Sequence, residues 1–229
     1  MQLHHHPFCP HSRLVRLSLG EMGIEPELIE ERVWERRPEF LRLDPAGNTP
    51  VLIDDNEMVV PSAPVITEYL DETRGHALGD RRLLPVDIFE RVEVRRLSGW
   101  FNDKFFAEVS EPLVREKVYK RYMPREAGGG PPDMAVIRAA RSNIRYHLHY
   151  IGWLLKARNW LAGDRMTYAD LAAAAHISCV DYLGDVPWNE DEAAKIWYAR
   201  IKSRPAFRPL LALTMAGMPP APCYADLDF

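Results

Sequence analysis

Apolar positions in the first 75 residues change period several times, which is typical of short strands alternating with helices. A polar tip separates two short apolar runs and predicts a hairpin, whereas apolar residues at helical spacing predict amphipathic helices. The pattern predicts strands at 3–7, 27–33, 51–53 and 58–60, helices at 12–22 and from Ser62, and a short helical turn at 38–43. This βαβ-αββα order indicates a thioredoxin-like α/β domain at residues 1–76.

After residue 76 the pattern changes to long segments with helical periodicity and no strand signal. Residues 77–86 are expected to form a linker, and residues 87–229 an all-helical second domain with an extended tail from about residue 216. Prolines and glycines at 124–132 predict a mobile loop. The expected helices of this domain are 87–108, 111–122, 133–157, 167–183 and 190–202.

Composition narrows the possible functions mainly by exclusion. The chain has 229 residues, 47% of them hydrophobic, and its formal net charge of −4 is spread over mixed positions. This distribution indicates neither a nucleic-acid site nor a membrane-surface patch, and no apolar run is long enough for a membrane span. Three cysteines, at positions 9, 179 and 223, form no disulfide framework, and the histidines show no metal-ligand grouping. We therefore expect a cytoplasmic protein without a metal.

Four short motifs follow one another along the chain. Two lie in the first domain, Cys9–Ser12 and Asn48–Leu52, and two in the second, Leu83–Asp87 and Leu161–Leu171. In this order and at these separations they resemble the glutathione transferase family over essentially the whole chain. The resemblance implies the glutathione transferase fold, in which a thioredoxin-like N-terminal domain precedes an all-α C-terminal domain.

The resemblance implies structural roles for two of these motifs. Pro50 resembles the cis-proline of the family, which turns the backbone of Thr49 outward; a trans-proline that starts a strand is the alternative. Thr167 and Asp170 have the spacing of a capping box at a helix N-terminus. In the family this box locks the core of the second domain, so we expect a structural role for both residues.

Cys9 is the candidate residue for chemistry. A thiol just before a helix N-terminus is stabilised as the thiolate by the positive end of the helix dipole. Cys9 matches the nucleophile of cysteine-type transferases and glutaredoxins, and Ser12 stands where a second redox cysteine or a thiolate-binding hydroxyl would lie. The alternative is that Cys9 is a small residue without a catalytic role and that Ser12 only caps the first helix.

The start of the third helix departs from the family pattern. The resemblance implies an acidic or amide residue followed by serine, which hold the ammonium and the carboxylate of the γ-glutamyl group; here the pair is Pro61-Ser62. Pro64 removes a further amide donor, and Asp54 or Asp55 would have to compensate. The expected remnant of the glutathione site is Thr49, Pro50 and Ser62. We therefore expect weak or absent glutathione binding and no cofactor.

The C-terminal tail is a candidate for partner binding. Prolines at 219, 220 and 222 make it stiff, and residues 224–229 alternate apolar and acidic positions, which suits an extended peptide in a groove. The alternative is a strap folded over the protein's own surface. The candidate contact residues of the tail are Asp226, Asp228 and Phe229.

Two further surface signals are open to two interpretations. Trp34 follows the second strand and is either an exposed aromatic anchor for a partner or a locally packed side chain. The cationic segment 112–121, with Arg115 and Lys117, is either a solvated helix face or a binding face for an acidic partner.

Further sequence details resemble one branch of the family, a group of bacterial cell-division proteins. They are residues 5–12, Pro61-Ser62, Glu116–Val118, Asp181–Trp188 and Asp226–Phe229. The resemblance implies a non-catalytic homodimer that binds FtsZ filaments at the division site and regulates their curvature and constriction. The competing hypothesis is a glutathione-dependent transferase or thiol transferase that uses Cys9 and Ser12, and a weaker third is a zeta-type isomerase.

Overall fold

The computed structural model describes residues 1–227, and its first domain is built on a four-stranded sheet with the order β2-β1-β3-β4. Strand β1 (Gln2–His5) pairs in parallel with β2 (Glu27–Glu30) and antiparallel with β3 (Val51–Ile53), which pairs antiparallel with β4 (Val59–Pro61). The parallel pair followed by a hairpin is the predicted thioredoxin-like arrangement. The predicted fold class is therefore confirmed.

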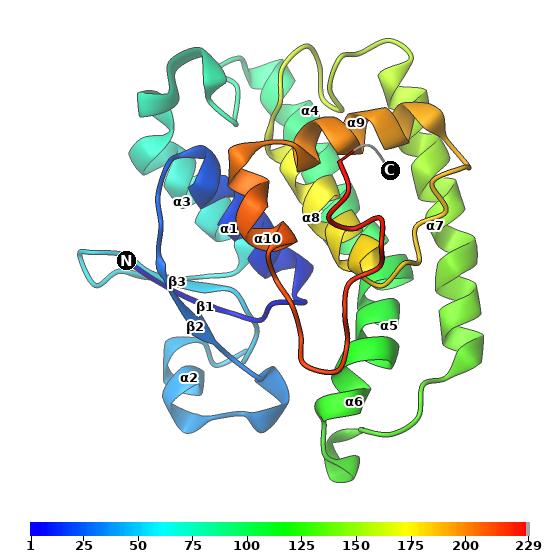
Figure 1. Ribbon diagram of the computed structural model, residues 1–229. Helices are drawn as coiled ribbons and strands as arrows, with labels where there is room; N and C mark the ends of the chain where they lie inside the picture. The colour runs from blue at the N-terminus through cyan, green and yellow to red at the C-terminus, as the bar shows by residue number, and fades with distance from the viewer. Residues whose placement is uncertain (228–229) are drawn as a thin grey trace.

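Helices cover both faces of this sheet. Helices α1 (Pro10–Glu21) and α3 (Ala63–Arg74) lie on one side of it and α2 (Pro38–Leu43) on the other (Figure 1). The first helix begins at Pro10 rather than at the predicted Ser12, because proline fits the first helical position and leaves Cys9 as the N-cap. The predicted second strand was too long, since residues after Glu30 leave the sheet for the 3₁₀ turn η1 (Val33–Glu35).

The prediction of separate helices at 87–108 and 111–122 was wrong, since the chain is helical without a break from Ile88 to Tyr122. Ser110 and Glu111 both have right-handed helical dihedrals. Pro112 has no N–H to donate, and the chain accommodates it where wide π-helical turns give way to α-helix. The segments are α4 (Ile88–Gly99), π-helical η3 (Trp100–Ser110), α5 (Glu111–Val114), π-helical η4 (Arg115–Tyr119) and α6 (Lys120–Tyr122).

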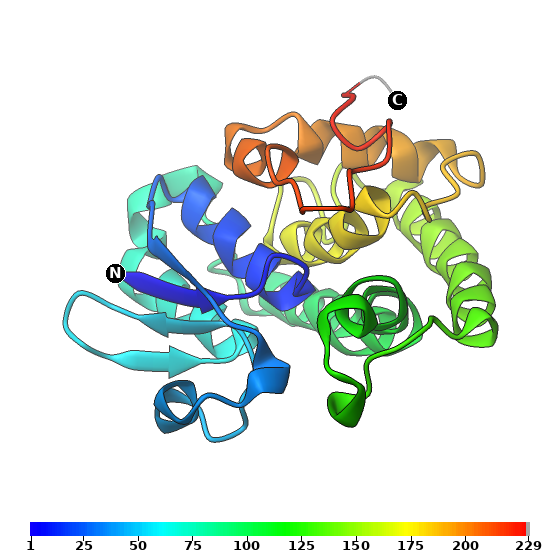
Figure 2. The same cartoon turned by 60° about the horizontal axis from the view of Figure 1, so that its bottom comes forward.

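The rest of the second domain is arranged around one buried helix. Helix α8 (Tyr168–Tyr182) is buried along its whole length and packs against α1, so it joins the two domains (Figure 2). Its run of small alanines allows neighbouring elements to approach closely. The remaining elements are η2 (Gly75–Arg81), η5 (Arg125–Ala127), α7 (Met134–Leu155), α8 (Tyr168–Tyr182), α9 (Glu192–Lys202), η6 (Pro205–Phe207) and α10 (Arg208–Leu211).

A capping box begins α8. The hydroxyl of Thr167 accepts a hydrogen bond from the backbone of the first turn, and the Asp170 carboxylate accepts from the Thr167 N–H at 2.9 Å. The same buried carboxylate also accepts from the Leu161 N–H at 2.9 Å and from the Trp197 indole at 3.0 Å. The Thr167 hydroxyl is a fourth donor to this carboxylate, at 3.1 Å. Burial raises the pKa of Asp170 despite these four donors. Asp170 therefore ties a loop and two helices together inside the core.

The tail folds over the protein's own surface as far as Tyr224. The ring of Tyr224 is fully buried, and the Ala221 N–H donates to the Tyr182 carbonyl at 2.9 Å. Asp226 lies beyond this contact and is exposed. Asp228 and Phe229, the other two candidate contact residues of the tail, lie outside the described residues.

Candidate functional site

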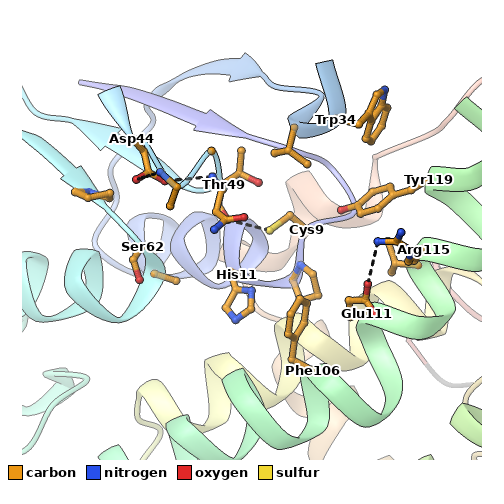
Figure 3. Close-up of a pocket in the computed structure, with 18 of the residues that line it drawn as sticks. Cys9, His11, Trp34, Asp44, Thr49, Ser62, Phe106, Glu111, Arg115 and Tyr119 are labelled. Carbon is orange, nitrogen blue, oxygen red and sulfur yellow. Dashed lines mark hydrogen bonds and ion pairs between the residues drawn. The ribbon is translucent and has the colours of Figure 1, made fainter. Parts of the chain in front are cut away.

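A cleft of about 880 Å³ opens between the two domains. One wall comes from the first domain, where the first turn of α1, η1 and the loop before β3 meet the start of α3 (Figure 3). The other wall comes from the long helix of the second domain, from η3 to η4, and from Met123 and Ala127 beyond it. The residues labelled in Figure 3 are Cys9, His11, Trp34, Asp44, Thr49, Ser62, Phe106, Glu111, Arg115 and Tyr119.

Cys9 lines this cleft as the N-cap of α1, with 8% of its surface exposed. Its thiol donates to the carbonyl of Thr49 at 3.3 Å. Burial acts to raise the pKa of Cys9, but the hydrogen bond and charge of His11, with a smaller effect of Ser12, lower it to about 7. The helix N-terminus acts in the same direction. At neutral pH a substantial fraction of this thiol is thus the nucleophilic thiolate.

His11 is a site residue to which the sequence interpretation gave no role. Its Nε2 donates to the carbonyl of Asn102 at 3.0 Å, and its ring packs edge-on against Phe106 at 4.6 Å. Burial opposes protonation, but the interaction with Cys9 outweighs it and raises the pKa of His11. A basic side chain two residues after the thiol, in the same helical turn, was the signal that could have revealed this pair.

Ser12 supports the turn before Cys9. It is fully buried, and its hydroxyl accepts a hydrogen bond from the His6 N–H at 3.4 Å. Ser12 lies inside the first turn, so the expectation that it might only cap α1 is wrong: Cys9 holds the N-cap position. Through its contact with the thiol it also lowers the pKa of Cys9.

The turn that precedes the cis-proline is held by side-chain hydrogen bonds. The Thr49-Pro50 peptide bond is cis, as predicted. Before it, the carboxylate of Asp44 accepts hydrogen bonds from the backbone N–H groups of Ala46 and Asn48 at 3.2 and 3.1 Å. This turn fixes the backbone of Thr49 at the cleft.

Pro61 and Ser62, the pair predicted at the start of the third helix, lie in two different elements of the structure. Pro61 belongs to strand β4, and Ser62 is the N-cap, with a positive φ of 74° and no side-chain hydrogen bond to its own helix. Pro64 lies in the first turn and lacks an N–H. An anion at this helix end would therefore meet the amides of Ala63 and Val65 and the Ser62 hydroxyl.

Asp54 and Asp55, the two acidic residues considered as replacements for the group missing at Pro61, are held by other residues. Asp54 accepts hydrogen bonds from the Tyr69 hydroxyl and from Arg74, and Asp55 binds the amino group of Met1. Neither lines the cleft. The acidic side chains that do line it are Asp44, Asp103 and Glu111.

Trp34 packs across the domain boundary. Its ring lies 5.6 Å from that of His6 and 5.3 Å from that of Tyr119 in the second domain. Trp34 is half-buried and lines the cleft, so it is neither a free surface anchor nor packed within its own loop alone.

The two cationic candidates lie in different settings. Arg115 lines the rim of the cleft with half of its side chain exposed, 3.8 Å from Glu111. Lys117 turns away from the cleft and donates to the buried carboxylate of Asp185 at 2.6 Å.

Within residues 1–227 no group of three or more ligating side chains could hold a metal ion, and no helix is long and apolar enough to cross a bilayer.

The thioredoxin-like domain, the cis-proline and the interdomain cleft together define a class of protein. The family model of the glutathione S-transferase N-terminal domain matches residues 3–77, and that of the C-terminal domain matches residues 111–205. This chain belongs to the glutathione S-transferase family.

More specific similarity comes from individual relatives. The chain is 46% identical to FtsZ-localized protein A of Caulobacter vibrioides, over 99% of this chain and 97% of that protein. A solved structure of FzlA from C. crescentus, 47% identical, covers 100% of this chain and 99% of its own, with a TM-score of 0.92. A structure described as a glutathione S-transferase from Sinorhizobium meliloti is 54% identical, covers 100% and 99%, and has a TM-score of 0.97. The chain therefore resembles a protein localised with FtsZ over its whole length.

Proposed function

We propose that this protein is a non-catalytic, dimeric cell-division protein that binds FtsZ filaments at the division site and regulates their curvature and constriction. The observation that carries the proposal is the 46% identity to FtsZ-localized protein A over 99% of this chain. The name of that relative states its localisation; filament binding and control of curvature are our extension to this chain. The similarity extends over both domains and covers 97% of the relative.

The composition of the cleft supports a non-catalytic role. Pro61 lies in the position expected for the group that binds the γ-glutamyl ammonium, and Asp54 and Asp55 are held elsewhere. Losing one charge-assisted hydrogen bond costs roughly 1.5–3 kcal/mol, or about a tenfold to hundredfold loss of affinity. A cleft with this defect is a poor site for glutathione.

An exposed apolar face supports a homodimer. Ile88, Phe89 and Val92 lie within one turn of each other at the start of α4, and they are 71%, 84% and 60% exposed. Large apolar side chains clustered at this exposure are typical of an interface. A second copy of the chain would cover them, and a dimer with two equivalent sites would bind a polymer with avidity.

Two of the candidate contact residues are accessible to a filament. Arg115 is half-exposed at the rim of the cleft, and Asp226 is exposed beyond the buried part of the tail. Lys117 is a weaker candidate, because its ammonium is held by Asp185. We therefore assign the filament contact to Arg115 at the cleft rim and to Asp226 in the tail.

The second candidate function is a thiol transferase, and the observation that favours it is the Cys9–His11 pair. A thiol with a pKa of about 7 in the lining of a cleft is suited to thiol–disulfide exchange. In that reaction the Cys9 thiolate attacks a disulfide, forms a new S–S bond and releases the other sulfur as a thiolate. Ser12 would then support the turn that presents Cys9.

Co-sedimentation with FtsZ polymerised with GTP tests the leading proposal. At micromolar concentration, the protein should be recovered in the pellet together with the filaments. Its absence from the pellet would refute the proposal. The thiol-transferase candidate is tested separately by disulfide exchange with wild-type protein and Cys9→Ala.

A further inference from the structure

Residues 215–224 form a strap that closes over Tyr182 at the end of α8. The Tyr182 hydroxyl donates to the Met218 carbonyl at 2.7 Å and accepts from the Met215 N–H at 3.1 Å. The Tyr182 carbonyl accepts from the Ala221 N–H at 2.9 Å. One tyrosine therefore holds the strap at three points along its length.

The strap also supplies acceptors to two buried cations. The ammonium of Lys202, whose side chain is fully buried, donates to the Cys223 carbonyl at 2.7 Å. The guanidinium of Arg13, which is also fully buried, donates to the Tyr224 hydroxyl at 3.3 Å and to the Ser178 hydroxyl at 2.9 Å. Buried charges need such partners, so displacing the strap leaves both cations with fewer acceptors than the folded core provides.

Arg13 connects the strap to the turn that carries Cys9. Its Nε donates to the Pro7 carbonyl at 2.8 Å, and its guanidinium lies 5.1 Å from the centre of the Phe8 ring. The Phe8 ring packs edge-on against Tyr182 at 4.8 Å, and Tyr182 packs against Tyr224 at 5.0 Å. One continuous set of buried contacts thus runs from the tail to the residue before Cys9.

We propose that the strap and the turn Pro7–Cys9 form one cooperative unit, so that displacing the strap increases the exposure of Cys9, which is 8% exposed in the cleft. Tyr224 and Arg13 connect the strap to the turn. A binding partner would contact the exposed residues 225–227 and displace the strap from there. The coupling is reciprocal, so a ligand that holds the Cys9 turn also holds the strap. This inference goes beyond the proposed function and stands without FtsZ, because both ends of the coupling belong to this chain.

The test compares the alkylation rate of Cys9 by iodoacetamide in full-length wild type, Tyr224→Phe, Tyr224→Ala and the control Leu227→Ala. Mass spectrometry follows the tryptic peptide 1–13, whose single cysteine is Cys9. Hydrogen exchange of residues 215–224 measures whether the strap has opened, and circular dichroism identifies unfolded variants. Tyr224→Phe removes only a hydroxyl, so it remains informative if Tyr224→Ala fails to fold.

Tyr224→Phe removes the hydrogen bond from Arg13 and the one that the Tyr224 hydroxyl donates to the Leu210 carbonyl at 2.9 Å. One lost hydrogen bond changes an opening equilibrium by about fivefold, so we expect both strap exchange and Cys9 alkylation to speed up by at least that factor. Leu227→Ala should change neither rate, because the side chain lies beyond the anchor and is 43% exposed. Faster strap exchange with an unchanged alkylation rate would overturn the coupling. Unchanged strap exchange in Tyr224→Phe would overturn the role of Tyr224 as the anchor.

Discussion

Nη2 of Arg74 lies 2.7 Å from both carboxylate oxygens of Asp54, inside the first domain and away from the cleft. Burial acts to raise the pKa of Asp54, but the Tyr69 hydroxyl and Arg74 lower it, so the carboxylate is charged and already paired. Asp54 is close in the sequence to Pro61, but its carboxylate is therefore not available to bind the γ-glutamyl ammonium of glutathione. Because Arg74 holds Asp54, this carboxylate does not replace the ligand-binding group that is missing at Pro61.

Glutathione should bind weakly or not at all. Calorimetric titration of the protein with millimolar glutathione should give no saturable heat, because the charge-assisted contact expected at Pro61 is missing. Ser62→Ala should then leave the titration unchanged. Saturable binding that Ser62→Ala or Cys9→Ala removes would contradict this prediction and favour the transferase.

The reactivity of Cys9 should depend on pH around neutrality. Since a pKa lowered to about 7 populates the thiolate above that pH, the alkylation rate should rise with a midpoint near 7. In His11→Ala the midpoint should move upward, because burial then raises the pKa of Cys9 without the opposing imidazole. Ser12→Ala should move it less. Equal midpoints in wild type and His11→Ala would disprove the role given to His11.

Asp170 should be a major source of stability. Asp170→Ala leaves the Leu161 and Trp197 N–H donors without their acceptor in the core, so we expect a loss of about 3 kcal/mol in the free energy of unfolding. Urea denaturation measures this loss. Asp164→Ala, at an exposed position of the same loop, should cost little. Similar losses in the two variants would argue against a structural role for Asp170.

The apolar face of α4 should hold two copies of the chain together. Phe89→Glu places a charge in the centre of this face and should shift the protein from dimer to monomer in analytical ultracentrifugation. Ile196→Glu is the matched control, because Ile196 is 60% exposed on a different helix, α9. A wild-type protein that is monomeric, or a Phe89→Glu protein that stays dimeric, would refute the assigned face.

Local sequence signals predicted much of the fold and part of the site. The capping box at Thr167 and Asp170 follows from the spacing of two nearby residues, whereas the cis-proline at Pro50 was implied by the resemblance to the glutathione transferase family; both are present as predicted. The continuous helix through Pro112 was not predicted, because a proline normally indicates a helix boundary. The π-helical turns that accommodate it leave no simple periodicity.

The sequence did not predict contacts between residues that are far apart in the chain. Arg13 is fully buried, yet nothing near it in the sequence indicates a partner 211 residues away at Tyr224. The pairing of Asp54 with Arg74 and the contact of Trp34 with Tyr119 likewise depend on how distant elements meet. Contacts of this kind decide which side chains of the candidate site are free to bind.

Binding to filaments is most directly tested by co-sedimentation with FtsZ in GTP and in GDP, using wild type, Arg115→Glu, Asp226→Lys and the control Arg42→Glu. Arg42 is 72% exposed on α2 and lies outside the cleft. Wild type and Arg42→Glu should sediment with GTP filaments, whereas Arg115→Glu and Asp226→Lys should sediment less. Absence of wild-type protein from the GTP pellet at micromolar concentration would contradict the account.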